Sequence, residues 1–160
     1  MIYDQADIVA RRLLGQKVGD RVYYETAQTS EDIRNLLEKT ARVVITAPRR
    51  SGKTTELLKY ANEQHPFSAY CIVCLNQDIQ RKIILRHREL FNAKNVAKRL
   101  NGFKIEETEV NPPLMLTPNN LELLRGGARK PVFVDEFKML PEDAQKTILD
   151  SGLFVAAVTS

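Results

Sequence analysis

The sequence predicts a three-layer α/β fold in which helices cover both faces of a mostly parallel sheet. Short, mostly β-branched runs such as residues 41–46 alternate with segments of helical periodicity, and this alternation is typical of βαβ units. Continuous apolar character indicates strands that are buried on both faces. A chain of 160 residues with 43% apolar side chains fits one domain with one core.

The individual elements follow from periodicity and from start and stop signals. We expect a helix at residues 2–14, within an N-terminal helical segment of about residues 1–27, and a second helix at 30–40 with Ser30 as its N-cap. Further along, the patterns predict strands at 41–46, 69–75, 131–137 and 153–159 and helices at 54–64, 77–91 and 141–150. Residues 92–100 extend the helix at 77–91 or form another, and residues 103–125 are expected as short extended pieces, among them 121–125.

Composition excludes two classes of protein. Cys71 and Cys74 are the only thiols, and charged residues interrupt the N-terminal apolar positions, so a secreted disulfide framework is not expected. The two cysteines would point to opposite faces of a strand, which favours core packing over a zinc site. No apolar run approaches the roughly 18 to 20 residues of a membrane span. We therefore expect a cytoplasmic protein without a membrane span.

The segment after the first predicted buried strand carries the clearest chemistry. It reads A-P-R-R-S-G-K-T at residues 47–54, a phosphate-binding loop with Ala in place of its first Gly. Such a loop cradles phosphates with backbone N–H groups at a helix N-terminus. Lys53 would meet the β and γ oxygens, and the Thr54 hydroxyl would bind Mg²⁺. The expected nucleotide-binding residues here are Ala47, Pro48, Arg49, Arg50, Ser51, Gly52, Lys53, Thr54 and Thr55.

A second motif, Val132-Phe133-Val134-Asp135-Glu136, completes the site. A strand that ends in Asp at the carboxyl edge of a parallel sheet, beside the first strand, can bind Mg²⁺ through its coordination shell. Glu136 can polarise an attacking water. Arg49 or Arg50 can stabilise charge on the γ-phosphate, and one of the pair is expected to face solvent. Together the motifs predict a P-loop NTPase that uses ATP and Mg²⁺.

Basic residues are concentrated between residues 81 and 104, where eight Lys and Arg accompany the single acid Glu89. Lys and Arg that neutralise phosphates supply most nonspecific affinity for nucleic acid. A solvated helix face is the alternative explanation. The candidate DNA contacts are Arg81, Lys82, Arg86, Arg88, Lys94, Lys98 and Arg99.

These motifs resemble a known family over residues 28–160. The segments RRSGKTT (49–55), AYCIVCLNQDIQRKII (69–84) and NNLELLRGGARKPVFVDEF (119–137), with a strand ending in VTS (158–160), are similar to the ATPase domain of the large terminase subunit of tailed phages and related viruses. That domain resembles superfamily 1 and 2 helicase cores. The short segment between Asp135 and Val158 favours this branch over archaeal-type AAA ATPases.

The resemblance implies further roles. An Arg in the phosphate loop senses the γ-phosphate, Thr159 and Ser160 match the coupling motif, and Gln28 matches an adenine contact, although it could be an ordinary loop residue. The implied function is ATP hydrolysis that drives packaging of double-stranded DNA in the host cell interior, in a homo-oligomeric ring or with other packaging proteins. No acidic cluster resembles a nuclease site, so no nuclease domain is expected.

Three alternatives remain open on the sequence. The first is a helicase-like or AAA-type ATPase fragment. The second is a nucleotide-dependent switch or interaction module that does not hydrolyse ATP, although the Asp135 and Glu136 pair argues against it. The third is a phosphate loop that no longer binds anything.

Overall fold

The computed structural model describes residues 22–39, 42–65, 68–100, 111–125 and 130–160, with backbone only at 92–100 and 125. The strands are β1 (Tyr23–Thr26), β2 (Val43–Thr46), β3 (Cys71–Val73), β4 (Leu114–Leu116), β5 (Val132–Val134) and β6 (Val155–Thr159). The helices are α2 (Ser30–Lys39), α3 (Lys53–Gln64), α4 (Gln77–Leu100) and α5 (Glu142–Leu149), with 3-10 segments η2 (Pro118–Arg125) and η3 (Phe137–Met139). The expected helix at 2–14 lies outside the described residues.

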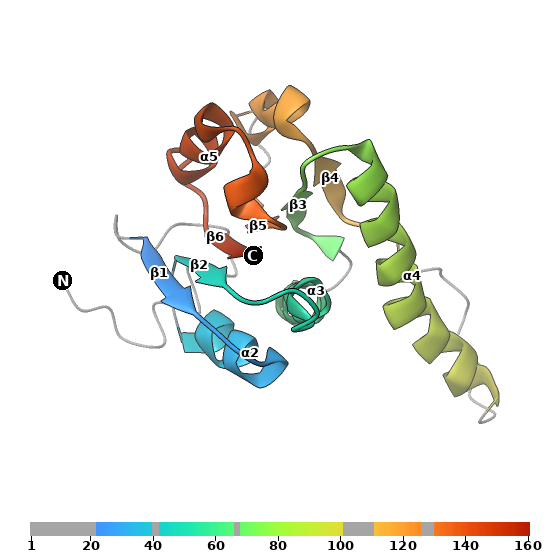
Figure 1. Ribbon diagram of the computed structural model, residues 1–160. Coiled ribbons are helices and arrows are strands. Elements are labelled where there is room, and N and C mark those ends of the chain that lie inside the picture. The colour runs from blue at the N-terminus through green and yellow to red at the C-terminus, as the bar shows by residue number, and fades with distance from the viewer. Residues whose placement is uncertain (1–21, 40–41, 66–67, 101–110, 126–129) are drawn as a thin grey trace.

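The six strands of the described residues form one parallel sheet in the order β1-β2-β6-β5-β3-β4. The sheet is flanked by helices, as Figure 1 shows, so the three-layer α/β architecture is confirmed. One expectation is wrong: β5 does not lie beside β2, because β6 pairs with both of them. Val44 of β2 is opposite Ala157 of β6, and Val134 of β5 is opposite the same Ala157.

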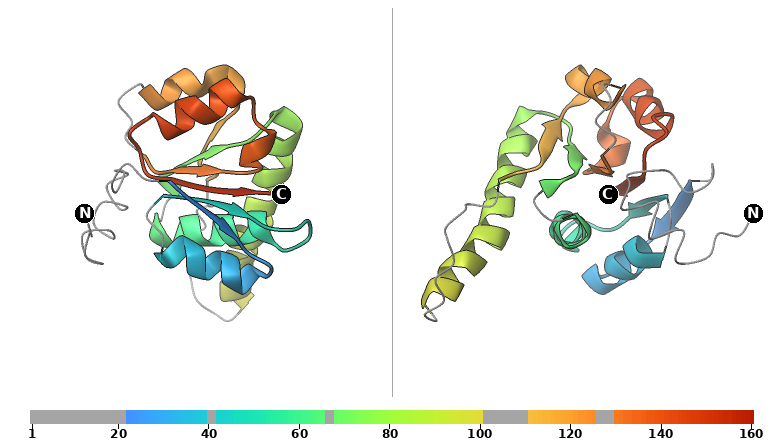
Figure 2. Two further views of the ribbon diagram at one scale, coloured as in Figure 1. Left: turned by 60° about the vertical axis from the view of Figure 1, so that its left-hand side comes forward. Right: turned by 180° about the vertical axis from the view of Figure 1, so that it is seen from behind.

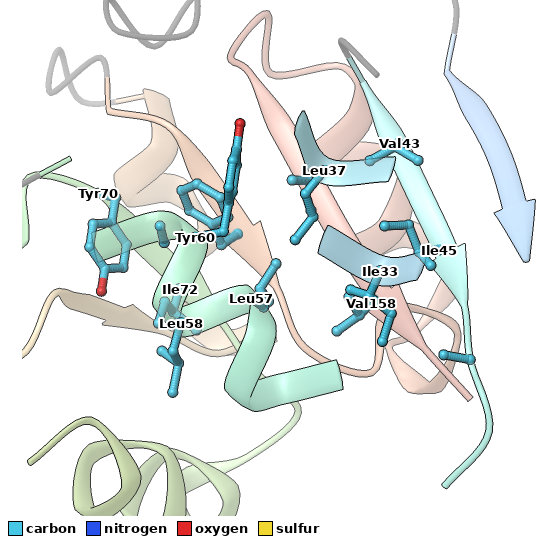
Figure 3. Packing of buried hydrophobic residues seen from close by; sticks show 14 of the residues in the cluster. Ile33, Leu37, Val43, Ile45, Leu57, Leu58, Tyr60, Tyr70, Ile72 and Val158 are labelled. Carbon is cyan, nitrogen blue, oxygen red and sulfur yellow. The ribbon is translucent and has the colours of Figure 1, made fainter. Parts of the chain in front are cut away.

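Two buried hydrophobic clusters lie between the sheet and its helices, one on each face of the sheet. On one face, α2, α3 and the start of α4 cover the sheet; η2, η3 and α5 cover the other, as the views in Figure 2 show. In Figure 3, α2 sets Ile33 and Leu37 against Val43, Ile45 and Val158. The alternation of β2 explains the division, because Val43 and Ile45 pack in the first cluster while Val44 packs in the second.

Aromatic side chains fill the centre of the first cluster. The ring of Phe133 lies edge-on to Tyr60 at 6.3 Å, Tyr70 at 5.5 Å and Phe154 at 6.1 Å between centroids. His65 also packs here and is only 5% exposed. Edge-to-face contacts of this kind add to the energy of area burial, so the cluster fixes β5 and α3 relative to each other.

The helix expected at 30–40 is present as α2, but its cap differs from the prediction. The backbone N–H of Asp32 donates to Thr29 Oγ1 at 3.2 Å, and the N–H of Thr29 donates to Asp32 Oδ2 at 3.3 Å. This reciprocal pair is a capping box, so Thr29 caps the helix and Ser30 is its first residue.

Three further expectations are corrected. Residues 23–26, inside the expected helical N-terminal segment, form strand β1. Residues 121–125 belong to the 3-10 segment η2 and are not extended. Phe137 leaves the predicted strand and begins η3. Helix α4 runs without interruption through residues 92–100, and in the described part of the chain no helix is both long and apolar enough to span a membrane.

Candidate functional site

Parallel strands place their carboxyl ends at one edge of the sheet, where ligands bind in open α/β folds. At this edge, β2 leads into the loop 47–52, β5 is followed by Asp135 and Glu136, and β6 ends at Thr159 with Ser160 after it. The two motifs predicted from sequence therefore meet, with the end of β6 between them.

The backbone of the loop explains its residue types. The N–H of Ala47 donates to the carbonyl of Thr159 at 2.9 Å, and the N–H of Ser51 donates to the carbonyl of Pro48 at 3.3 Å. Gly52 has φ 78°, a left-handed conformation that glycine adopts without steric cost. Ala47 is not among the residues with positive φ, so Ala is accommodated where the motif has its first Gly. Helix α3 then begins at Lys53, with its N-terminus at the site.

Lys53 lies between two partners. Its Nζ forms an ion pair with Glu136 Oε1 at 2.9 Å and donates to Ser160 Oγ at 2.9 Å. The side chains of Lys53 and Glu136 are 9% and 16% exposed. In this state the loop lysine is held by a carboxylate, in the role that a phosphate oxygen would take. A phosphate bound at the loop would compete with Glu136 for this ammonium.

Thr54 and Asp135 form the second contact across the site. The Thr54 hydroxyl donates to Asp135 Oδ1 at 2.8 Å. Burial raises the pKa of the Asp135 carboxyl, as does the charge of Glu136, while the Thr54 hydrogen bond and the charges of Lys53 and Arg86 lower it. Because this hydroxyl and this carboxylate already lie side by side, they fit a magnesium ion that completes its shell with water and phosphate oxygens. No group of three or more His, Cys, Asp or Glu side chains gathers within the described ranges.

Thr159 and Ser160 link the two halves of the site. Ser160 donates its hydroxyl to Glu136 Oε1 at 3.1 Å and its backbone N–H to Glu136 Oε2 at 3.2 Å. The buried Thr159 accepts a hydrogen bond from the N–H of Lys138 at 3.1 Å, and its carbonyl accepts one from Ala47. The pair selected by resemblance thus touches the phosphate loop and both motif-bearing strands.

The backbone at Glu136 is strained. Its φ and ψ are 50° and 52°, a left-handed conformation that costs a residue with a side chain about 1–2 kcal/mol. Such strain persists where the surrounding contacts over-determine it and is common at functional positions. Here the conformation directs the carboxylate to Lys53 and Ser160.

The loop arginines and Gln28 lie on the surface of the protein. Arg49 and Arg50 are exposed, and neither forms an ion pair with another described residue. Gln28 is also exposed and lines a hollow of about 280 Å³ beside the loop, near the lower size limit of ligand pockets. The other lining residues are Thr26, Ala27, Thr46, Ala47, Pro48 and Ser160.

Of the DNA-contact candidates, four have described side chains, and all four are exposed on α4: Arg81, Lys82, Arg86 and Arg88. Lys94, Lys98 and Arg99 lie further along this helix, where the structure describes the backbone only. The helix extends well beyond the edge of the sheet (Figure 1).

Sequence reasoning missed one contact at the site. Arg86 Nη1 donates to Thr55 Oγ1, in the first turn of α3, at 3.0 Å. The topology could have predicted this proximity, because α4 follows a parallel strand and therefore begins at the same edge of the sheet as the phosphate loop.

Comparison of the chain with protein-family models, with curated proteins and with solved structures returned no match.

Proposed function

We propose that the chain is a Mg²⁺-dependent ATPase domain of the terminase-like kind that acts on double-stranded DNA. The observation that carries this proposal is the convergence of Lys53 and Thr54 with Asp135 and Glu136 at the carboxyl edge of the sheet, through contacts of 2.9 and 2.8 Å. A cation for phosphate, a hydroxyl and carboxylate for the metal, and a second carboxylate for water are the groups that phosphoryl transfer to water requires.

Each group then has a defined task. Lys53 and the backbone N–H groups at the start of α3 bind the phosphates, and Arg49 or Arg50 stabilises charge on the γ-phosphate. Thr54 and Asp135 would hold Mg²⁺, which supplies neutralisation of the phosphate oxygens. Once a phosphate displaces it from Lys53, Glu136 is free to accept a proton from the attacking water.

The exposed basic side chains of α4 support a nucleic-acid partner, because Lys and Arg on one protruding helix neutralise phosphates. With such a partner, the protein would work in the cytoplasm, or in the host interior if it is viral, in a homo-oligomeric ring or with other packaging proteins. A helicase-like or AAA-type ATPase shares all these groups and differs in its response to DNA.

The test is ATP hydrolysis with and without duplex DNA, for the wild type, Lys53→Ala and Glu136→Gln, with Lys59→Ala as the control. Lys59 is an exposed cation of the same helix, away from the site. We expect the wild type to hydrolyse ATP and duplex DNA to raise the rate. Both site variants should lower that rate by at least about a hundredfold, and the control should keep it. Hydrolysis coupled to strand separation would favour the helicase-like function instead.

One observation favours a second candidate, a nucleotide-dependent switch. Lys53 and Glu136 are paired with each other, so ATP binding alone would break this pair and release Ser160. Tight ATP binding that Lys53→Ala loses, with no turnover at high protein concentration or with DNA, would support the switch and contradict the ATPase.

A further inference from the structure

Arg86 brings a positive charge from α4 to the first turn of the phosphate-loop helix. Its guanidinium donates to Thr55 Oγ1 at 3.0 Å, and Thr55 adjoins Thr54, which donates to Asp135. Burial raises the pKa of Asp135, and the charge of the same guanidinium is among the effects that partly offset this rise. Through its hydrogen bond to Thr55, Arg86 is held next to the residue that contacts Asp135.

A cation in this position is unfavourable by itself. The N-terminus of a helix carries a partial positive charge, which repels Lys and Arg and attracts anions. Lys53 already adds one cation to the first turn of α3, and its charge is balanced by Glu136. A second cation at this end is stabilised when an anion occupies the site.

Arg86, like Arg49 and Arg50, has no carboxylate partner among the described residues, whereas two other arginines do. Arg34 pairs with Glu38 and Glu63, and Arg81 pairs with Asp78. Within the described part of the chain, Arg86 has no carboxylate within ion-pair distance, and its hydrogen-bond partner is a neutral hydroxyl. Its N–H groups beyond the one used by Thr55 are available to an acceptor.

We propose that Arg86 is a phosphate-binding residue that contacts the terminal phosphate of the bound nucleoside triphosphate and makes the site prefer triphosphate to diphosphate. This inference rests on the proposed nucleotide site. Arginine suits the role because its planar fork binds phosphate oxygens in pairs and keeps its charge at all relevant pH values. Because Arg86 lies on α4, its contact with the terminal phosphate would link nucleotide binding to the helix that carries the exposed basic side chains.

The experiment compares equilibrium binding of ATP and ADP, each with Mg²⁺, in the absence of DNA. The proteins are the wild type, Arg86→Gln, Arg86→Lys and the control Lys59→Gln, which removes an exposed cation from α3 itself. We expect Arg86→Gln to weaken ATP binding about tenfold, the effect of one charge-assisted contact, while ADP binding changes less than about twofold. Arg86→Lys should retain part of the preference, and Lys59→Gln all of it.

The alternative is that Arg86 only ties α4 to α3. In that case Arg86→Gln would weaken ATP and ADP binding equally and lower the thermal midpoint, which overturns the inference. An unchanged ratio with unchanged stability overturns it as well, and both results leave the proposed function standing. A wild type that binds neither nucleotide refutes the proposed function and this inference together.

Discussion

Glu136→Gln is expected to bind ATP more tightly than the wild type while losing hydrolysis. The Glu136 carboxylate lies 2.9 Å from Lys53 Nζ, with side-chain exposures of 16% and 9%. At this separation the Coulomb attraction is about 6 kcal/mol for an effective dielectric constant of about 20. Desolvation and side-chain ordering offset most of it, and we take about 1–2 kcal/mol as the net value of a pair that is neither exposed nor fully buried.

In the proposed function a phosphate competes with that carboxylate for Lys53, so the net value of the pair opposes ATP binding. The amide that Glu136→Gln introduces keeps the shape, and its one oxygen can still accept one of the two hydrogen bonds that Ser160 donates to the carboxylate. It does not carry the competing charge. We expect the Kd for ATP to fall about five- to thirtyfold, since about 1.4 kcal/mol is a factor of ten. The loss of the proton acceptor should reduce kcat by at least about a hundredfold.

The assay is a binding titration with a non-hydrolysable ATP analogue and Mg²⁺, together with single-turnover hydrolysis of ATP. Glu122→Gln is the control, because it removes an exposed carboxylate from η2, away from the site. An ATP affinity of Glu136→Gln that is equal to or weaker than that of the wild type, in a protein of unchanged thermal midpoint, would refute the competition between carboxylate and phosphate.

Three other predictions concern the loop and the core. Thr54→Val, which lacks the hydroxyl that binds Asp135 at 2.8 Å, should raise the Mg²⁺ concentration needed for ATP binding at least about tenfold, whereas Thr54→Ser should not; equal Mg²⁺ titrations of the two would exclude the metal role. Gly52→Ala should cost about 1–2 kcal/mol of stability in urea denaturation, because φ is 78° and the nearest atom to the new Cβ, Ser30 Cβ at 3.7 Å, leaves space; a smaller loss would show that the loop relaxes. Burial lowers the pKa of His65 to about 4 from 6.5 in the unfolded chain, so the unfolded state takes up the proton first as the pH falls. The free energy of unfolding should therefore decrease between pH 6.5 and pH 4, by up to about 1.4 kcal/mol per pH unit. The same pH dependence in His65→Phe would assign the effect to other groups.

The part of the site that lies in contiguous motifs was predictable from sequence. Lys53 and Thr54 follow a buried strand and open a helix, and Asp135 and Glu136 end another strand, so the parallel topology alone brings them to one edge of the sheet. The capping of α2 by Thr29 was also predictable from the sequence, because Thr29 and Asp32 have the spacing of a capping box.

Three features depended on information that local patterns do not carry. Strand β1 has four exposed residues, so it shows no alternation of buried and exposed positions that would mark a strand. In residues 121–125, Leu121 and Leu124 are buried and Leu123 is exposed, a spacing of three that fits the 3-10 turn better than an extended segment. The order of the strands is set by pairing between distant segments, and periodicity within each strand does not report its neighbours.

The position of β6 between β2 and β5 has a consequence for how the site can work. If β5 lay directly beside β2, Asp135 and Glu136 would adjoin the loop, and residues 159–160 would lie outside the site. With β6 inserted, the Thr159 hydroxyl accepts from the N–H of Lys138 and its carbonyl accepts from the N–H of Ala47, while Ser160 contacts both Lys53 and Glu136. If the proposed function holds, a phosphate that separates Lys53 from Glu136 would break or strain the contacts of Ser160 at the same time. These hydrogen bonds would connect the backbone at residue 160 to a phosphate in the loop, and Ser160→Ala should weaken that connection while leaving the ion pair in place.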